Sequence, residues 1–347
     1  MRVRLSTRTP RAGGRRGPCI AAFAALLWTL AGWGRPPREA GAGRNPQESK
    51  GQPAAARLAS FDGARAFRDL KALVAFGPRP AGSDALAHSR NYIERELAAS
   101  GLKVEEDKFT ATTPVGSLDM ANLMVRIPGT SPDIVVVAGH YDTKRFDKFR
   151  FVGANDGASS AALVLELGRV LAGKRLPYTL WLVWFDGEEA QLQQWQGTDN
   201  DYGSRHLVQS LSAEGRLDRV KALILVDMIG DAKLDVRRDT GSTPWLTDVE
   251  FSAARRLGYG SYFLNQDITV GGDDYDPWLA AGVPSVDLID FNYGPNARSR
   301  PGDPDWNIYW HTAQDTVEHC SAQSLEVVGR VVLGMLQDLE NSPHVRP

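Results

Sequence analysis

The chain has 347 residues and a formal net charge of −2, with hydrophobic residues making up 42% of the sequence. This length is sufficient for one large domain with an extensive core, and the near-neutral charge excludes an electrostatic argument for nucleic-acid binding, which usually shows as a basic face. Because Cys19 and Cys320 are the only cysteines and Cys19 falls in an N-terminal targeting segment, the mature domain is expected to fold without an internal disulfide.

The N-terminal segment has the order of an export signal. Arginines are frequent up to Arg16, and an apolar stretch follows at residues 19–33. This order is recognised by export machinery, and the apolar stretch is short for a membrane span. No small-x-small cleavage site follows at once, so an uncleaved anchor that tethers the chain to a membrane is an alternative to a cleaved signal. We expect a protein that is exported, either periplasmic or secreted.

Residues 34–56 are rich in Gly, Pro, Arg and Ala, a composition typical of a disordered linker. We therefore expect residues 1–56 to comprise the signal segment or anchor and the linker. Residues 57–347 are expected to form a single domain.

The spacing of apolar residues predicts the elements of this domain. Helical spacing covers residues 61–76 and 83–100, and residues 103–111 and 120–127 are typical of paired strands at an antiparallel edge. From residue 133 onward, strands and helices alternate. The predicted strands are 133–139, 178–185, 221–227 and 283–289, and the predicted helices are 157–172, 201–212, 246–257 and 322–341.

These strands are almost continuous apolar runs, as expected when helices cover both faces of a sheet. The fold class is therefore predicted to be α/β: a three-layer sandwich with a mixed, mainly parallel, twisted sheet and helices on both faces. Residues 291–309 have no periodicity and are rich in Gly, Pro, Asn and Arg. A loop of this length in a compact domain is usually functional or disordered.

Acidic and histidine residues follow the ends of the predicted strands. His140 follows the first strand of the alternating part, Glu188 and Glu189 follow the second, and Asp227 ends the third. Because the carboxyl ends of parallel strands open onto one crevice, these side chains are expected to meet there. Asp, Glu and His in one pocket are ligands suited to zinc, and a glutamate left free beside a metal can act as an acid/base.

Several of these residues also have simple structural interpretations. Asp156, at the start of a predicted helix, could be its N-cap. Asp273 and Asp274 could form a turn and a helix start, and Asp227 could make a structural hydrogen bond. Two adjacent glutamates could be a solvated acidic turn. The occurrence of all these residues at successive strand ends favours a shared catalytic site over the separate structural roles.

The histidines and tryptophans are treated separately. His311 precedes Asp315, and a nearby carboxylate often orients an imidazole that binds a metal, so we expect His311 to be a ligand. His140 is not expected to be one. Trp181 and Trp184, within a predicted strand, fit a core. The tryptophans at loop-like positions are candidates for lining a pocket, namely Trp195, Trp278, Trp306 and Trp310.

The ordered motifs resemble the zinc aminopeptidase superfamily, and within it the glutaminyl-peptide cyclotransferases. The general pattern is His-x-Asp, Asn/Thr-Asp-Gly/Ser, Glu-Glu, Asp and a late His-Thr, and residues 60–340 contain all of these in order. Details of the cyclotransferase type are His140-Tyr-Asp-Thr-Lys144, Phe185-Asp-Gly-Glu-Glu-Ala190 followed by Trp195, Tyr202-Gly-Ser-Arg-His-Leu207, Asp273-Asp274 before Pro277, and Trp310-His311-Thr312.

The resemblance implies a role for each matching residue. One Zn²⁺ per chain is expected, with Asp156, Glu189 and His311 as its ligands. Glu188 matches the catalytic acid/base. The other matches are the acids that hydrogen-bond around Glu188, Asp227 and Asp274, and the substrate-binding aromatics, Trp195 and Trp310. The implied substrates are peptides or proteins with an N-terminal glutamine, which the enzyme converts to pyroglutamate.

Two alternatives remain open. In a two-zinc aminopeptidase, His140 and Asp227 would hold a second metal, Asp156 would bridge, and Glu188 would activate water. A metal-poor binding protein is a third possibility, against which the complete ligand set argues.

The chain also departs from the animal cyclotransferases, because Gly139 and Tyr275 replace a Cys and a His. These departures indicate a bacterial-type branch.

Overall fold

The computed structural model describes residues 61–345 of the chain. The expected signal segment and linker, residues 1–56, lie outside the described residues. Within residues 61–345, no helix has both the length and the apolar character needed to cross a membrane.

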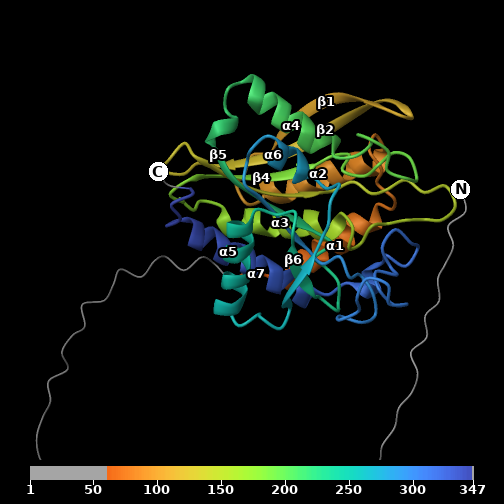
Figure 1. Cartoon of the computed structure of the whole chain (residues 1–347). Helices are drawn as coiled ribbons and strands as arrows, with labels where there is room; N and C mark the ends of the chain where they lie inside the picture. Colours follow the sequence, from red (N-terminus) through yellow and green to blue (C-terminus); the bar gives the residue numbers. More distant parts are fainter. Residues whose placement is uncertain (1–60, 346–347) are drawn as a thin grey trace, which may run out of the picture. The chain divides into compact units, whose positions relative to one another are not determined.

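A six-stranded sheet in the order β1-β2-β4-β3-β5-β8 forms the centre of the described part (Figure 1). The strands are β1 (Glu105–Thr113), β2 (Gly116–Ile127), β3 (Ile134–His140), β4 (Thr179–Phe185), β5 (Val220–Asp227) and β8 (Ser285–Ile289). β4, β3, β5 and β8 run parallel to one another, whereas β2 runs antiparallel to both of its neighbours, β1 and β4. The predicted mixed, mainly parallel sheet is confirmed.

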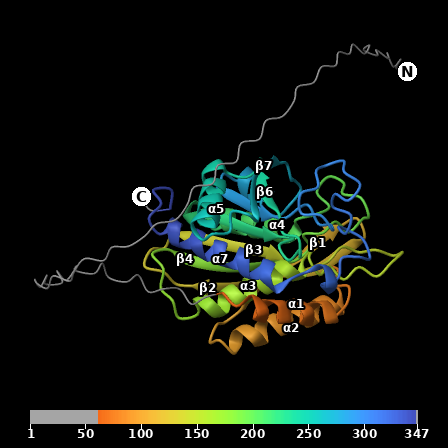
Figure 2. The same cartoon turned by 90° about the horizontal axis from the view of Figure 1, so that it is seen from below.

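Helices cover both faces of this sheet, which completes the predicted three layers. The larger group, on one face, comprises α1 (Gly63–Ala75), α2 (Asp84–Ala98), α3 (Ala158–Leu171), α5 (Pro244–Arg256) and α7 (Ala322–Leu339), and Figure 2 shows these helices in front of the sheet. The opposite face carries α4 (Tyr202–Ala213) and α6 (Asp276–Ala280). Short 3-10 turns occur at Leu217–Arg219 and Val317–His319.

Strand β3 shows why these runs are apolar throughout. Val135 and Val137 belong to the core shared with α3 and α7, while Val136 and Ala138 belong to the core shared with α4. Successive side chains alternate between the faces of a strand, so a strand covered on both sides buries every residue. This pattern places the end of β3, at His140, inside the protein.

Three short elements are absent from the prediction. They are the parallel pair β6 (Val236–Asp239) and β7 (Phe263–Ile268), and α6. The first two carry charged or exposed residues, and α6 has only five residues, so none gives a periodic apolar signal. The β1–β2 hairpin also reaches further than predicted, to Thr113 and Gly116, because its tip is exposed and lacks a hydrophobic pattern.

Gly139 provides a test of how tightly the sheet packs on α3. A Cβ at this position would lie 2.7 Å from the Cβ of Ser160 and 2.9 Å from the backbone oxygen of Val226. We expect Gly139→Ala to destabilise the fold by about 1–3 kcal/mol, the usual cost of overpacking a core. Thermal unfolding measures this. Gly260→Ala is the control, since its Cβ would meet only Arg255 Cγ, at 3.7 Å, and an equal loss in both variants would contradict the prediction.

Candidate metal centre and active site

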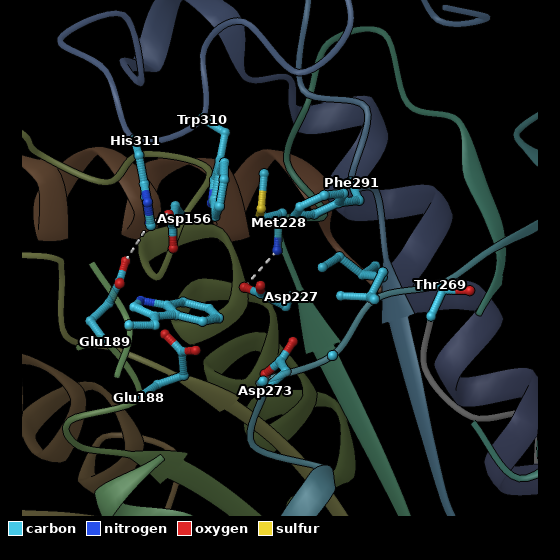
Figure 3. Close-up of a pocket in the computed structure, with 15 residues that line it drawn as sticks. Asp156, Glu188, Glu189, Asp227, Met228, Thr269, Asp273, Phe291, Trp310 and His311 are labelled. Carbon is cyan, nitrogen blue, oxygen red and sulfur yellow. Dashed lines mark hydrogen bonds and ion pairs between the residues drawn. The ribbon is translucent and has the colours of Figure 1, made fainter. Parts of the chain in front are cut away.

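A cavity of about 170 Å³ opens at the carboxyl ends of the parallel strands (Figure 3). Asp227 and Ile289 line it from the ends of β5 and β8, and Glu188 and Glu189 from the loop that follows β4. The other lining residues come from the loop after β4 (Trp195), the turn after β5 (Met228), the segment before α3 (Asp156), residues 269–273 and the late loop that contains Phe291, Trp310 and His311. The site therefore lies where the strand-end rule places it.

One group of possible metal ligands contains Asp156, Glu189 and His311. The Nε2 atom of His311 lies 3.0 Å from Glu189 Oε1 and 3.2 Å from Asp156 Oδ2. One ligand atom from each residue fits within 4.8 Å of the others. Two carboxylates and one imidazole that converge in this way suit zinc, and three protein ligands leave a position for substrate.

A second group shares Asp156 with the first. His140 Nε2 lies 3.1 Å from Asp227 Oδ1 and 3.3 Å from Asp156 Oδ1. The two oxygens of Asp156 thus face different histidines. The three residues His140, Asp156 and Asp227 are also close enough to hold an ion. The geometry alone is compatible with one metal or with two.

The backbone of the glutamate pair is fixed by a neighbouring strand end. The buried carboxyl of Asp142, just past β3, accepts hydrogen bonds from Glu188 N at 3.2 Å and Glu189 N at 3.3 Å. The ammonium of Lys144, which is also buried, lies 3.5 Å from Glu189 Oε2. Asp142 and Lys144 follow His140 by two and four positions, and this spacing is the sequence signal that could have identified them.

Asp315 acts differently from what its place near His311 suggests. Its carboxyl accepts hydrogen bonds from the backbone N–H groups of Asn155, at 2.8 Å, and Asp156, at 3.2 Å, so it holds the Asp156 loop. The expectation that Asp315 orients the imidazole is therefore wrong. His311 is instead packed by aromatic rings, with Trp310 stacked on it at 4.0 Å between centroids and Phe151 edge-on at 5.8 Å.

The simple capping interpretation of Asp156 is also wrong. Gly157, and not Asp156, is the N-cap of α3, and no side chain caps this helix. Gly157 has φ of +96°, a backbone conformation that glycine adopts without strain. The turn leaves the Asp156 carboxyl free to face the histidines.

Glu188 lies beside the first ligand group without belonging to it. It lines the cavity, and its Oε2 atom is 3.8 Å from His140 Nδ1. Burial and the charge of Glu189 raise the pKa of Glu188 well above its usual value. A carboxyl group whose pKa is raised holds a proton more readily than a free one, which suits a group that takes up and returns a proton.

The paired aspartates are resolved by the structure. Asp273 lines the cavity and points toward it in Figure 3, whereas Asp274 is not among the lining residues and is fully buried. Asp273 accepts a hydrogen bond from Asp274 N at 2.6 Å. Burial raises the pKa of Asp274 to about 7, against the opposing effect of the charge of His140. The resemblance implied a role for Asp274, whereas Asp273 is the member of the pair that lines the cavity.

Asp227, at the end of β5, also lines the cavity. Its Oδ1 atom accepts hydrogen bonds from Met228 N at 2.8 Å and from the Ser160 hydroxyl at 3.3 Å, besides its contact with His140. Met228 has φ of +49°, so the chain turns sharply after the strand. This carboxyl is therefore held firmly at the cavity wall.

Aromatic side chains form the remaining walls. Trp195 and Trp310 both line the cavity, and Phe291, 5.3 Å from Trp310 between ring centroids, was not predicted. Trp278 is instead buried in the α4 face of the core, and Trp306 packs under the guanidinium of Arg237. Phe291 and residues 269–272 belong to irregular segments, where only the unusual length of the 291–309 stretch signalled a function.

Comparison with known proteins identifies the family of the chain. Residues 122–336 match peptidase family M28. A glutaminyl-peptide cyclotransferase-like protein of Bos taurus is 37% identical over 289 residues, covering 75% of this chain and 72% of the relative. The glutaminyl-peptide cyclotransferase of Drosophila melanogaster is 34% identical over 285 residues, covering 73% and 76%.

Solved structures give the same result. The glutaminyl cyclase of an Acidobacteriales bacterium is 41% identical with a TM-score of 0.75, covering 83% of this chain and 98% of that one. A Zn-dependent exopeptidase from Parabacteroides distasonis, at 23% identity and a TM-score of 0.70, shares the fold over 82% of this chain and 100% of that one.

Proposed function

Because the chain belongs to peptidase family M28 and, within it, to the glutaminyl-peptide cyclotransferases, we propose that it converts the N-terminal glutamine of peptides to pyroglutamate and releases ammonia. The observation that carries the proposal is the small cavity in which Glu188 lies beside a three-residue ligand group under aromatic walls. A cavity of roughly 150 Å³ in another protein holds one benzene molecule, so about 170 Å³ suits a single side chain.

One zinc is proposed to be held by Asp156, Glu189 and His311. The donor set fits this ion, because one ligand atom from each of the three residues converges within 4.8 Å. The Lys144 ammonium, 3.5 Å from Glu189 Oε2, helps to orient that carboxylate. Bound there, zinc would act as a Lewis acid on the γ-carbonyl of the substrate glutamine.

Glu188 is proposed to move the proton. It takes a proton from the α-amine as the nitrogen bonds to the γ-carbonyl carbon, and it returns the proton to the amide nitrogen as that carbon–nitrogen bond breaks and ammonia leaves. The raised pKa of Glu188 supports this role. Asp227 and Asp273 face the same cavity. Asp274 does not line it, but its backbone N–H donates a hydrogen bond to the Asp273 carboxyl and so positions that side chain.

Trp195 and Trp310 are proposed to enclose the glutamine side chain. Aromatic walls exclude water, which a cyclisation does not need, and hold the amine close to the carbonyl so that proximity supplies much of the rate. A two-zinc aminopeptidase is the second candidate, and the specific observation in its favour is the group of His140, Asp156 and Asp227. There Glu188 would activate water instead.

The product distinguishes the two functions. We expect peptides that begin with glutamine to give pyroglutamyl peptides, shorter by no residue and lighter by one ammonia, and peptides that begin with leucine or alanine to remain intact. Mass spectrometry of both sets after incubation with the zinc-loaded protein measures this. Release of a free N-terminal amino acid, lost again in Glu188→Gln, would establish the aminopeptidase and reject the cyclase.

Export is proposed from the sequence of the N-terminal segment. Arginines followed by the apolar residues 19–33 support a periplasmic or secreted protein, and an uncleaved segment would tether it to the membrane. Fractionation of cells expressing the full chain, with N-terminal sequencing of the mature protein, separates the cleaved from the anchored form.

A further inference from the structure

A second hollow adjoins the cavity at a shared rim. The groove has a volume of about 390 Å³, and Trp195 and Gly272 line both the groove and the inner cavity. The rim is tightly packed, since a Cβ at Gly272 would lie 2.9 Å from Trp195 Cζ3. Three other hollows on the described surface share no lining residue with the cavity. A peptide whose first side chain fills the cavity thus has an adjoining place for the residues that follow.

The groove combines apolar walls with a carboxylate. Trp195, Pro277 and Ala280 supply the apolar surface. The partly exposed carboxyl of Asp276 accepts a hydrogen bond from Gly272 N at 2.9 Å, and no Lys, Arg or His of residues 61–345 forms an ion pair with it. Its charge is therefore open to a ligand.

The cation in the groove is already engaged. Arg205 donates a hydrogen bond to Thr198 O at 2.6 Å and lies 3.7 Å from Asp201 Oδ2. Asp201 is 3% exposed, and its Oδ1 atom has no hydrogen-bond partner among residues 61–345. Among the charged residues that line the groove, the one without an ion-pair partner in residues 61–345 is therefore the acidic Asp276.

We propose that this groove binds the second and third residues of the substrate peptide and favours lysine or arginine there. The proposal rests on the proposed function and narrows its substrate class. A long cationic side chain would lay its aliphatic stem on Trp195 and Pro277 and carry its charge to Asp276. The walls hold their shape because Asn200 donates hydrogen bonds to both Asp201 and Gly272.

The test compares kcat/KM for cyclisation of Gln-Lys-Ala-Ala, Gln-Ala-Ala-Ala and Gln-Glu-Ala-Ala by the zinc-loaded protein. The lysine peptide is expected to exceed the alanine peptide by about fivefold, which is about 1 kcal/mol, the upper size of an exposed ion pair. The glutamate peptide is expected to fall below it. In Gln-Ala-Ala-Ala-Ala-Lys the cation lies beyond the groove, so this peptide should match the alanine peptide. An equal gain there would indicate long-range attraction and overturn the proposal.

Variants locate the effect. Asp276→Asn removes the charge while its amide oxygen can still accept from Gly272 N, and it should bring the ratio of kcat/KM for the lysine peptide over the alanine peptide to about one. Ala280→Lys should reverse the preference, whereas Ala98→Lys, at the exposed end of α2, should leave it unchanged. A preference that persists in both groove variants overturns the proposal. Failure to cyclise any glutamine peptide would instead reject the proposed function itself.

Discussion

Replacement of Glu188 by glutamine is expected to lower kcat by at least about a hundredfold, the usual contribution of a general acid/base, while leaving zinc in place. The carboxyl lines the cavity but is not part of the Asp156–Glu189–His311 group. Glutamine has nearly the same shape, and the hydrogen bond to Asp142 is made by the backbone N–H of residue 188, so the loop should keep its form. Steady-state kinetics and elemental analysis of the same preparation measure the two effects.

Glu189→Gln is the matched control, because it makes the same chemical change one residue along. The Glu189 side chain lies 3.0 Å from His311 Nε2 and 3.5 Å from the Lys144 ammonium. The main effect of this variant should therefore be a loss of zinc affinity. Excess zinc should restore part of its activity and should do nothing for Glu188→Gln. If zinc rescues Glu188→Gln instead, the two roles are reversed.

The histidines give the second large effect. With a single zinc on Asp156, Glu189 and His311, His311→Ala should lose the metal. Removing a residue that only supports a ligand lowers metal affinity roughly ten- to hundredfold, and removing the ligand itself should lower it further. His140→Ala should retain about one zinc per chain, since three protein ligands remain. Elemental analysis after gel filtration measures zinc per chain in wild type and both variants.

A wild type with two tightly bound zincs, reduced to one in each histidine variant, would contradict the single-metal site. That result would make Asp156 the bridge between two ions, since its Oδ1 lies 3.3 Å from His140 and its Oδ2 lies 3.2 Å from His311. Circular dichroism of both variants would show whether a loss of zinc reflects a lost ligand or a lost fold.

The fold was predictable where burial leaves a pattern. β3, β4 and β5 are buried on both faces and gave uninterrupted apolar runs, and α7 gave helical spacing over its whole length. β6 and β7 were missed because they are short and carry charged or exposed residues, which give no periodic apolar signal. The hairpin tip between residues 111 and 120 was missed because it is exposed and has no hydrophobic pattern.

The candidate site was predictable only to the level of segments. Strand ends located Glu188, Glu189 and Asp227, but a sequence cannot tell which of two adjacent acids in a loop faces a cavity, as with Asp273 and Asp274. That choice depends on backbone torsions set by the surrounding packing. Phe291 lies in a segment without periodicity, and its position beside the cavity depends on tertiary contacts that the local sequence does not show. The chemical roles of these residues remain predictions for the experiments above.

The ligand group also joins distant parts of the chain. Glu189 and His311 are 122 positions apart, and Cys320, the single cysteine within residues 61–345, is free, so no disulfide in this part of the chain closes the loop. A metal on these residues would act as a cross-link, and cross-links that close long loops remove the most disorder from the unfolded chain. The ion would thus secure the late loop to the sheet, and its affinity would set how firmly the catalytic face resists local unfolding.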